Sequence, residues 1–349
     1  MVVTVVVGGF FGDEGKGKIL SYLALRDNPD IVARGGVGPN AGHTVVYRGK
    51  EYKLRQVPSG FINPRSRLLI GPGVLVNPEV LLSEIEILSS FNVASRLGVD
   101  FQAGIIEPKH IEMDRELKKS IGTTGTGTGP ANAERALRKL KVAREIESLK
   151  PRLTDVPGEI HEAIEEDKYI LVEGTQGTFL SLYHGTYPYV TSKDVTASSI
   201  LADVGIGPKF VDDVIVVFKS YVTRVGPGPL EGELEREDME RLGMIEFGSV
   251  TGRPRRAAPF SVKLARRAIM LNGATSVAIT KLDVLFPEAR GAKRLEDLPR
   301  EAKKRLEEIE EAIKTPIRLI STGPGAEEII DLRERIVFNL RRHQVYEFR

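Results

Sequence analysis

The sequence predicts an α/β protein with a single large, mostly parallel, twisted β-sheet that is flanked by helices and carries inserted helical and loop subregions. Residues 2–7 (VVTVVV) form a nearly continuous β-branched run, which is typical of a strand buried on both faces and therefore of a parallel sheet. Later apolar runs of strand length also end in glycine-rich or polar segments. In open α/β sheets, ligands bind where such loops follow the carboxyl ends of the strands.

Local patterns predict the elements in chain order. Apolar residues recur at helical spacing after residue 18, and Asn77 before Pro78 and Glu79 supplies the capping residue, proline and acid that begin a helix. Strands are expected at residues 2–7, 30–34, 68–70, 169–172, 214–221, 275–280 and 317–320, a hairpin at residues 44–47 and 52–56, and helices at residues 131–149 and 293–314. The last helix interleaves Glu with Lys and Arg, so we expect its charges to form a solvated face.

Length and composition limit the class of protein. No repeat or linker divides the 349 residues, so we expect one α/β domain over residues 1–349 with insertions. Fifty basic and 48 acidic side chains give a net charge of +2, which argues against a nucleic-acid partner. No apolar run approaches the roughly 20 residues that span a bilayer, so we expect a cytoplasmic protein without a membrane partner. The absence of cysteine excludes disulfides and thiolate metal sites, which leaves mainly oxygen ligands for a metal.

The glycine-rich segment at residues 12–18 (GDEGKGK) lies between the first strand and the first helix. Its glycines allow backbone to approach phosphate oxygens, and its lysines neutralise them. The spacing of Gly12, Gly17 and Lys18 matches a P-loop and predicts a P-loop-NTPase-like fold, but Ile19 replaces the hydroxyl residue that binds magnesium. Asp13 offers a carboxylate ligand for Mg²⁺ instead. A tight turn with solvent-exposed charges is the alternative.

Three further stretches carry residues suited to nucleotide chemistry. His43 lies in a polar segment, where it is either a general acid or a structural histidine. Lys281 and Asp283 follow a strand; the carboxylate suits the ring N–H and exocyclic amine of guanine, and a simple ion pair is the alternative. Residues 253–256 (RPRR) form a compact basic loop, whose planar guanidinium groups suit a small dianionic substrate.

Ten stretches of the chain, in this order, resemble the motifs of the adenylosuccinate synthetase family. They are residues 12–18 (GDEGKGK), 40–44 (NAGHT), 56–60 (QVPSG), 122–130 (GTTGTGTGP), 173–178 (EGTQGT), 184–191 (HGTYPYVT), 223–226 (TRVG), 251–256 (TGRPRR), 280–283 (TKLD) and 321–324 (STGP). The chain is shorter than common members between residues 124 and 176. The resemblance implies an enzyme that uses GTP and Mg²⁺ to join L-aspartate to inosine monophosphate (IMP) through a 6-phosphoryl intermediate. A GTPase-type nucleotide switch or regulatory binding protein is the alternative, suggested by the glycine loop and by Lys281 and Asp283.

The resemblance also assigns residues. Asp13 would take the N1 proton of IMP, His43 would be the general acid, and Lys16 would stabilise phosphate charge. Mg²⁺ would bind Asp13 and the backbone carbonyl of Gly42, and Arg138 would reach the site from the other subunit of a homodimer. The expected GTP site comprises Gly12, Asp13, Glu14, Gly15, Lys16, Gly17, Lys18, Gly42, His43, Thr44, Arg255, Lys281, Leu282, Asp283, Ser321, Thr322 and Gly323. The expected IMP site comprises Asp13, Glu14, Gly15, Lys16, Asn40, Ala41, Gly42, His43, Thr124, Arg138, Gln176, Thr191 and Arg253, and the aspartate site comprises Thr251, Arg253 and Arg255.

Overall fold

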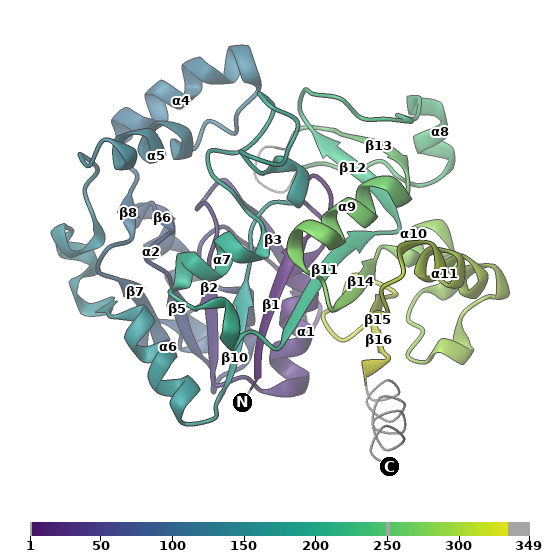
Figure 1. The fold of residues 1–349 in the computed structure, drawn as a ribbon, viewed down its shortest axis with the longest axis horizontal. Coiled ribbons are helices and arrows are strands. Elements are labelled where there is room, and N and C mark those ends of the chain that lie inside the picture. The colour runs from purple at the N-terminus through teal and green to yellow at the C-terminus, as the bar shows by residue number, and fades with distance from the viewer. Residues whose placement is uncertain (1, 249–251, 334–349) are drawn as a thin grey trace.

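The computed structural model describes residues 2–248 and 252–333. A ten-stranded sheet lies at the centre of this part of the chain, in the order β16-β15-β14-β11-β1-β10-β2-β5-β7-β9 (Figure 1). Neighbouring strands pair in parallel except β15 and β16, which are antiparallel. The predicted fold class is confirmed, and the fold is P-loop-NTPase-like.

The bounds of the elements are as follows. The central strands are β1 (Val2–Gly8), β2 (Ile31–Arg34), β5 (Arg67–Ile70), β7 (Leu97–Asp100), β9 (Leu153–Thr154), β10 (Tyr169–Glu173), β11 (Asp213–Lys219), β14 (Ser276–Thr280), β15 (Ile317–Ser321) and β16 (Ile329–Asp331). Three smaller pairs are β3 (His43–Tyr47) with β4 (Lys50–Leu54), β6 (Leu75–Val76) with β8 (Gly104–Ile105), and β12 (Tyr221–Val225) with β13 (Arg255–Pro259). The helices are α1 (Lys16–Asp27), α2 (Pro78–Ile87), α3 (Val93–Arg96), α4 (Pro108–Ile121), α5 (Thr128–Ala136), α6 (Val156–Glu165), α7 (Ala197–Val204), α8 (Arg236–Arg241), α9 (Val262–Asn272), α10 (Leu282–Leu285) and α11 (Arg300–Ile313).

Both faces of the central sheet are buried. Along β1, Val3, Val5 and Val7 belong to one apolar core and Val6 to another, as expected because side chains alternate along a strand. The first core includes apolar residues of α6, α7 and α9, and the second includes residues of α1 and α2. The β-branched run at the N-terminus therefore lies at the centre of a three-layer structure, as its composition predicts.

Three predicted elements are wrong in extent, and in the first two tertiary contacts override the local pattern. The helix expected at residues 131–149 ends at Ala136, and Arg138 adopts a left-handed conformation with φ of 61°. Beyond it, the backbone bonds to the region of β8, from Ile105 N–H to the Lys141 carbonyl at 2.9 Å and from Ala143 N–H to the Ala103 carbonyl at 2.8 Å. The strand expected at residues 214–221 ends at residue 219, and β12 leaves the central sheet to pair with β13.

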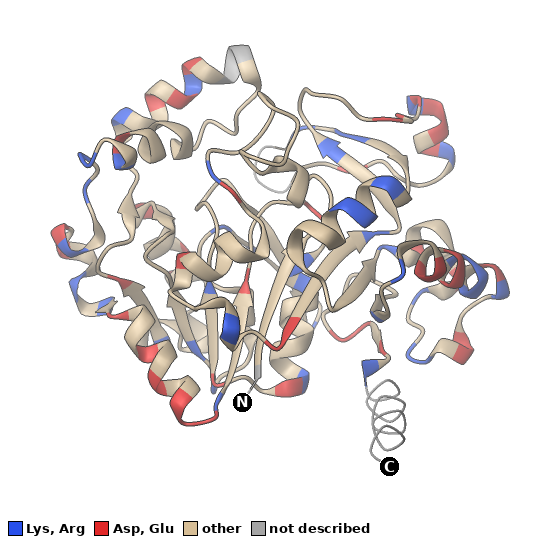
Figure 2. Ribbon diagram, in the orientation of Figure 1, with Lys and Arg blue, Asp and Glu red and all other residues tan. Residues whose placement is uncertain are grey.

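The helix expected at residues 293–314 is also shorter. It begins at Arg300 directly after Pro299, consistent with the restriction that proline places on the residue before it. Charges of both signs follow one another along α11 (Figure 2), and Lys304 lies 3.9 Å from Glu308, so the predicted solvated face is confirmed there. Among the described helices, none combines the length and the apolar character that crossing a bilayer requires.

Candidate active site

A cavity of about 1120 Å³ opens at the carboxyl ends of the parallel strands. The loops after β1, β10, β14 and β15 all contribute to its lining, which is the position expected for a ligand site in an open α/β sheet. The predicted site residues that line it are Gly12, Asp13, Gly15, Lys16, Gly17, Lys18, Asn40, Ala41, Gly42, His43, Thr44, Thr124, Gln176, Thr191, Arg253, Arg255, Lys281, Asp283, Ser321 and Gly323. Segments more than 300 residues apart in the sequence therefore meet around one space.

The loop before α1 is held in an unusual backbone conformation by Glu14. Gly12, Asp13 and Gly15 all have positive φ, at 86°, 59° and 87°, which for Asp13 costs roughly 1–2 kcal/mol. The buried Glu14 carboxylate accepts the Gly12 N–H at 2.8 Å and the Lys16 ammonium at 2.8 Å. The Glu14 side chain thus lies beneath the loop and supports it, while Asp13 lines the cavity.

Lys16 spans two of the loops that meet at the cavity. Its ammonium donates to Glu14 and to the backbone carbonyl of Gln176, which follows β10. These contacts use two of the three ammonium protons, so one is available to a ligand. Gly17 lets β3 approach closely, because a Cβ atom at this position would lie 2.9 Å from Cβ of His43.

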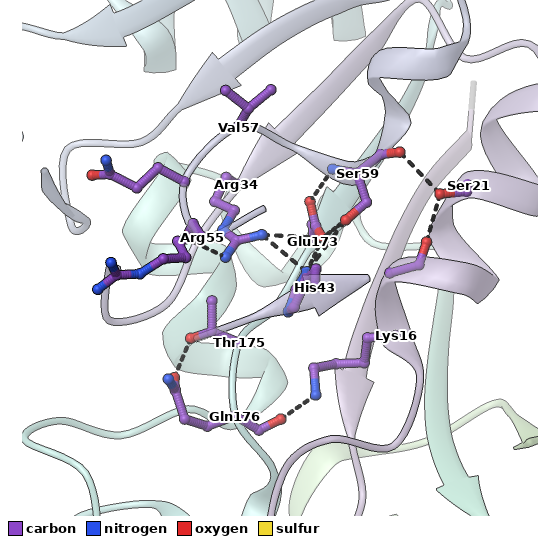
Figure 3. A network of polar contacts seen from close by, with 12 residues as sticks. Lys16, Ser21, Arg34, His43, Arg55, Val57, Ser59, Glu173, Thr175 and Gln176 are labelled. Atoms are coloured by element: carbon purple, nitrogen blue, oxygen red, sulfur yellow. Dashed lines mark hydrogen bonds and ion pairs between the residues drawn. The ribbon is translucent and has the colours of Figure 1, made fainter. Parts of the chain in front are cut away.

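His43 belongs to a buried polar network (Figure 3). Its Nδ1 contacts the carboxylate of Glu173 at the end of β10. Arg34, at the end of β2, lies 3.1 Å from the same carboxylate, and Ser59 donates to it through its N–H at 2.8 Å and its hydroxyl at 2.5 Å. Within residues 2–248 and 252–333, Nε2 of His43 has no hydrogen-bond partner although it is buried. The network therefore fixes one ring nitrogen and leaves the other for a ligand.

The charges of this network assign the proton. Although burial raises the pKa of Glu173, the charges of Arg34 and His43 outweigh it and hold the pKa at about 2. Burial, followed by the positive charge of Arg34, lowers the pKa of His43 to about 4. At neutral pH Glu173 is therefore a carboxylate, and the single ring proton of His43 lies on Nδ1 and donates to it.

The arginine loop contacts the glycine loop directly. Arg255 lies 2.8 Å from the Asp13 carboxylate and also pairs with Glu246. Burial lowers the pKa of Arg255, but Asp13 and Glu246 outweigh that effect and raise it above its usual value. Arg253 donates to the backbone carbonyl of Gly122 at 3.1 Å, which joins the loop to the Gly/Thr-rich segment. Thr251, the remaining residue of the expected aspartate site, lies outside the described residues.

The residues expected at a guanine base either line the cavity or support the loops that line it. Asp283 is 6% exposed and lies 3.3 Å from Arg290, while Lys281 has a left-handed backbone with φ of 61°. Leu282 is buried, and the Thr322 hydroxyl donates to the Ala292 carbonyl at 2.8 Å, so these two residues support the loops. Lys18, placed among phosphate-binding residues by its spacing, instead donates to Ser321 at 2.7 Å.

The comparisons with known proteins agree with this geometry. Residues 5–146 and 139–290 match the family model described as Adenylosuccinate synthetase. The protein of that name from Pyrococcus sp. (strain ST700) is 57% identical over 335 residues, which cover 95% of this chain and 99% of the relative. The one from Pyrococcus horikoshii is 56% identical over 339 residues, covering 96% and 100%. The chain belongs to the adenylosuccinate synthetase family.

Two solved structures have the same fold as this chain. The fully ligated adenylosuccinate synthetase from Plasmodium falciparum matches with a TM-score of 0.89 and 27% identity over 95% of this chain and 100% of that chain. The cyanophage S-2L succinoaminodeoxyadenylate synthetase, bound to dGMP and to dATP as an energy donor, matches with a TM-score of 0.78 and 25% identity over 98% and 99%. The prediction of a GTP-dependent ligase is confirmed, and that of a nucleotide switch is not supported.

In this adenylosuccinate synthetase family member, motif spacing alone does not assign a role to Glu173 and Glu246, the two carboxylates that hold His43 and Arg255. Each is buried or nearly so, and each binds several donors. The sequence does carry a signal for Glu173, because a charged residue that ends a buried apolar strand must find partners there.

Arg138 follows α5 and is not among the residues that line the cavity of its own chain.

Proposed function

We propose that Asp13, His43 and Lys16 carry out the chemistry by which this enzyme joins L-aspartate to IMP at the expense of GTP. The products of the reaction are adenylosuccinate, GDP and phosphate. The observation that carries the assignment is that Asp13 and His43 line one cavity, and that Nε2 of His43 has no hydrogen-bond partner among the described residues. The Lys281–Asp283 and Arg253–Arg255 segments also line it, so a triphosphate, a purine and a dicarboxylate have suitable partners there.

The first step is phosphoryl transfer. Asp13 takes the proton from N1 of IMP, the 6-oxygen bonds to the γ-phosphorus of GTP, and the bond from that phosphorus to the β-phosphate oxygen breaks. The products are 6-phosphoryl-IMP and GDP. His43 meets an oxygen of the transferring group through Nε2, and the negative charge of the bound triphosphate favours protonation of that nitrogen. Lys16 stabilises the phosphate charge with its remaining proton.

The second step is displacement at the purine. The aspartate amine bonds to C6, the bond between C6 and the former 6-oxygen breaks, and phosphate leaves with that oxygen while the amine loses one proton. Arg253 and Arg255 supply planar guanidinium groups for the two aspartate carboxylates, together with Thr251. Gln176, Thr124, Thr191 and Asn40 line the part of the cavity assigned to IMP.

The residues at Asp13 fit Mg²⁺. Asp13 and Gly42 both line the cavity and offer a carboxylate and a backbone carbonyl, the oxygen ligands that this ion prefers. The Asp13 carboxylate also pairs with a positive side chain, because the Arg255 guanidinium lies 2.8 Å from it. When bound, Mg²⁺ supplies charge neutralisation for the phosphate oxygens during transfer.

The proposed assembly is a homodimer in which Arg138 contributes to the site of the partner subunit. Its support is that Arg138 does not line its own cavity, so a role in substrate binding requires a second copy. Guanine selectivity is proposed to come from local residues such as Asp283, because the cyanophage relative was solved with dATP as an energy donor. The cytoplasmic location stays a prediction.

The test is an assay of GDP, phosphate and adenylosuccinate with each substrate omitted in turn. We expect all three products only when GTP, IMP, L-aspartate and Mg²⁺ are present together. Equal GTP turnover without IMP or without aspartate would contradict the proposed ligase reaction and favour a simple GTPase.

A further inference from the structure

Lys18 lies in the glycine loop, where its position suggests that it binds phosphate, but its hydrogen bonds indicate another role. It lies in the first turn of α1, yet its ammonium donates to the Ser321 hydroxyl at 2.7 Å, to the Glu328 carbonyl at 2.9 Å and to the Gly323 carbonyl. An ammonium group has three protons. These three acceptors use all of them, so none is left for a phosphate oxygen.

The three acceptors lie at the end of β15 and in the loop that joins it to β16. Ser321 and Gly323 line the cavity, and the Thr322 N–H closes the loop by donating to the Glu328 carbonyl at 3.0 Å. The Ala326 N–H donates to the carbonyl of Val46 in β3 at 2.8 Å, which anchors the outer side of the same loop. Lys18 adds three hydrogen bonds that join the loop to α1.

The ammonium is kept in this place at an energetic cost. Lys18 is 8% exposed, and burial lowers its pKa to about 7, although the carboxylates of Glu328 and Asp283 favour the charged form. Lys281 and Lys293 are also close enough to disfavour its charge. A buried cation is tolerated where its hydrogen bonds compensate for lost hydration, so the three bonds to the loop are the reason to keep a lysine here.

We propose that Lys18 is a positioning residue for base specificity, because its three hydrogen bonds hold the β15–β16 loop in the shape that accepts guanine beside Asp283. The inference rests on the proposed function, which places the guanine of GTP between this loop and Asp283. Lys18 does not touch the nucleotide in this account. Lys18 therefore affects recognition of the base and does not affect binding of the phosphates.

This distinction gives a direct test. A phosphate-binding lysine contributes equally to every nucleoside triphosphate, so its loss lowers kcat/KM for all of them by one factor. A lysine that shapes the base site raises kcat/KM for GTP and has little effect on kcat/KM for ATP. Its loss therefore lowers the ratio of the GTP value to the ATP value. Inosine triphosphate, which lacks the exocyclic amine of guanine, separates recognition of that amine from recognition of the rest of the base.

The experiment compares the wild-type enzyme with Lys18→Met and Lys18→Arg, using GTP, inosine triphosphate and ATP with saturating IMP and aspartate. Lys18→Met keeps the length of the side chain and removes its donors, and we expect the GTP to ATP ratio to fall about tenfold or more. Lys18→Arg keeps the charge, but its planar fork cannot direct three protons to acceptors around one atom, so we expect a smaller fall. Lys293→Met is the matched control, because Lys293 is exposed and donates to Glu327 of the same loop. It should leave the ratio unchanged.

Each outcome supports or overturns the proposal. An equal loss for all three nucleotides would show that Lys18 binds phosphate, and an unchanged ratio would show that it has no part in selectivity. If Lys18→Met does not unfold cooperatively, the GTP to ATP ratio of Lys18→Arg decides in the same way. Failure of the wild-type enzyme to form adenylosuccinate would overturn the proposed function itself, which is distinct from failure of the lysine variants.

Discussion

The guanidinium of Arg255 lies 2.8 Å from the carboxylate of Asp13, so the residue assigned as base is paired with a residue assigned to substrate binding. Both side chains line the same cavity, and Arg255 is 9% exposed. The Arg255 guanidinium competes with a purine N–H or a cation for that Asp13 oxygen. We therefore expect substrates to replace this ion pair, which couples the aspartate site to the phosphoryl-transfer site.

Glu173→Gln tests whether the carboxylate positions His43. A glutamine side chain has one oxygen for the donors of Ser59, Arg34 and His43, so the ring loses its fixed orientation. We expect kcat to fall about 10- to 100-fold while KM for GTP, IMP and aspartate changes by less than about threefold, as measured by steady-state kinetics.

Glu84→Gln is the matched control for that variant. Glu84 is also buried, and it accepts the N–H groups of Arg55, Gln56 and Val57 at 2.6, 3.0 and 2.8 Å without touching His43. We expect Glu84→Gln to lose about as much free energy of unfolding as Glu173→Gln, and to keep kcat within about threefold of the wild-type value. An equal loss of kcat in both variants would mean that Glu173 acts only through stability.

Asp283→Asn tests the base site from its other side. The buried carboxylate is assigned as the acceptor for two guanine donors, and an amide oxygen leaves one of them without a partner. We expect the ratio of kcat/KM for GTP to that for ATP to fall about 10- to 100-fold. A ratio equal to that of the wild-type enzyme would place guanine elsewhere.

Arg138 and Asp13 variants test the shared site by complementation. We expect an Arg138→Leu chain and an Asp13→Asn chain each to be inactive as homodimers, whereas a mixed dimer would contain one site with both native residues. Because half of randomly mixed dimers are of this kind, about a quarter of the wild-type activity should return. Activity in mixtures no greater than that of the separate variants would contradict a site built from two subunits.

Buried lysines predict the pH dependence of stability. Burial lowers the pKa of Lys219 to about 8 and that of Lys18 to about 7, below the value of about 10.5 in an unfolded chain. The unfolded state therefore binds more protons between pH 7 and 10, so the free energy of unfolding rises with pH there, by at most about 1.4 kcal/mol per pH unit for each lysine. Denaturant unfolding of Lys219→Met from pH 7 to 9.5 should show a smaller slope, and that of the exposed Lys304→Met the wild-type slope. An unchanged slope in Lys219→Met would contradict this assignment.

Much of the fold follows from local sequence, whereas contacts in the site join distant segments. The run at residues 2–7 and the glycine loop after it predict β1 and α1, because strand burial and loop chemistry are local. The role of Glu173 depends on His43, 130 residues away, and that of Lys18 on Ser321, 303 residues away. Motif spacing assigned Lys18 to phosphate because nothing in residues 12–18 reveals the loop that binds it. The helix expected at residues 131–149 failed for the same reason, since β8 binds its backbone.

Transfer of the 6-oxygen of IMP to phosphate shows whether that oxygen attacks the γ-phosphorus of GTP. With IMP that carries ¹⁸O at C6, we expect each phosphate released during adenylosuccinate formation to carry the label. Asp13→Asn should release labelled phosphate at roughly a thousandth of the wild-type rate or less, because an amide cannot take the N1 proton. Formation of adenylosuccinate with unlabelled phosphate would rule out the 6-phosphoryl intermediate, because the 6-oxygen would not have attacked the γ-phosphorus.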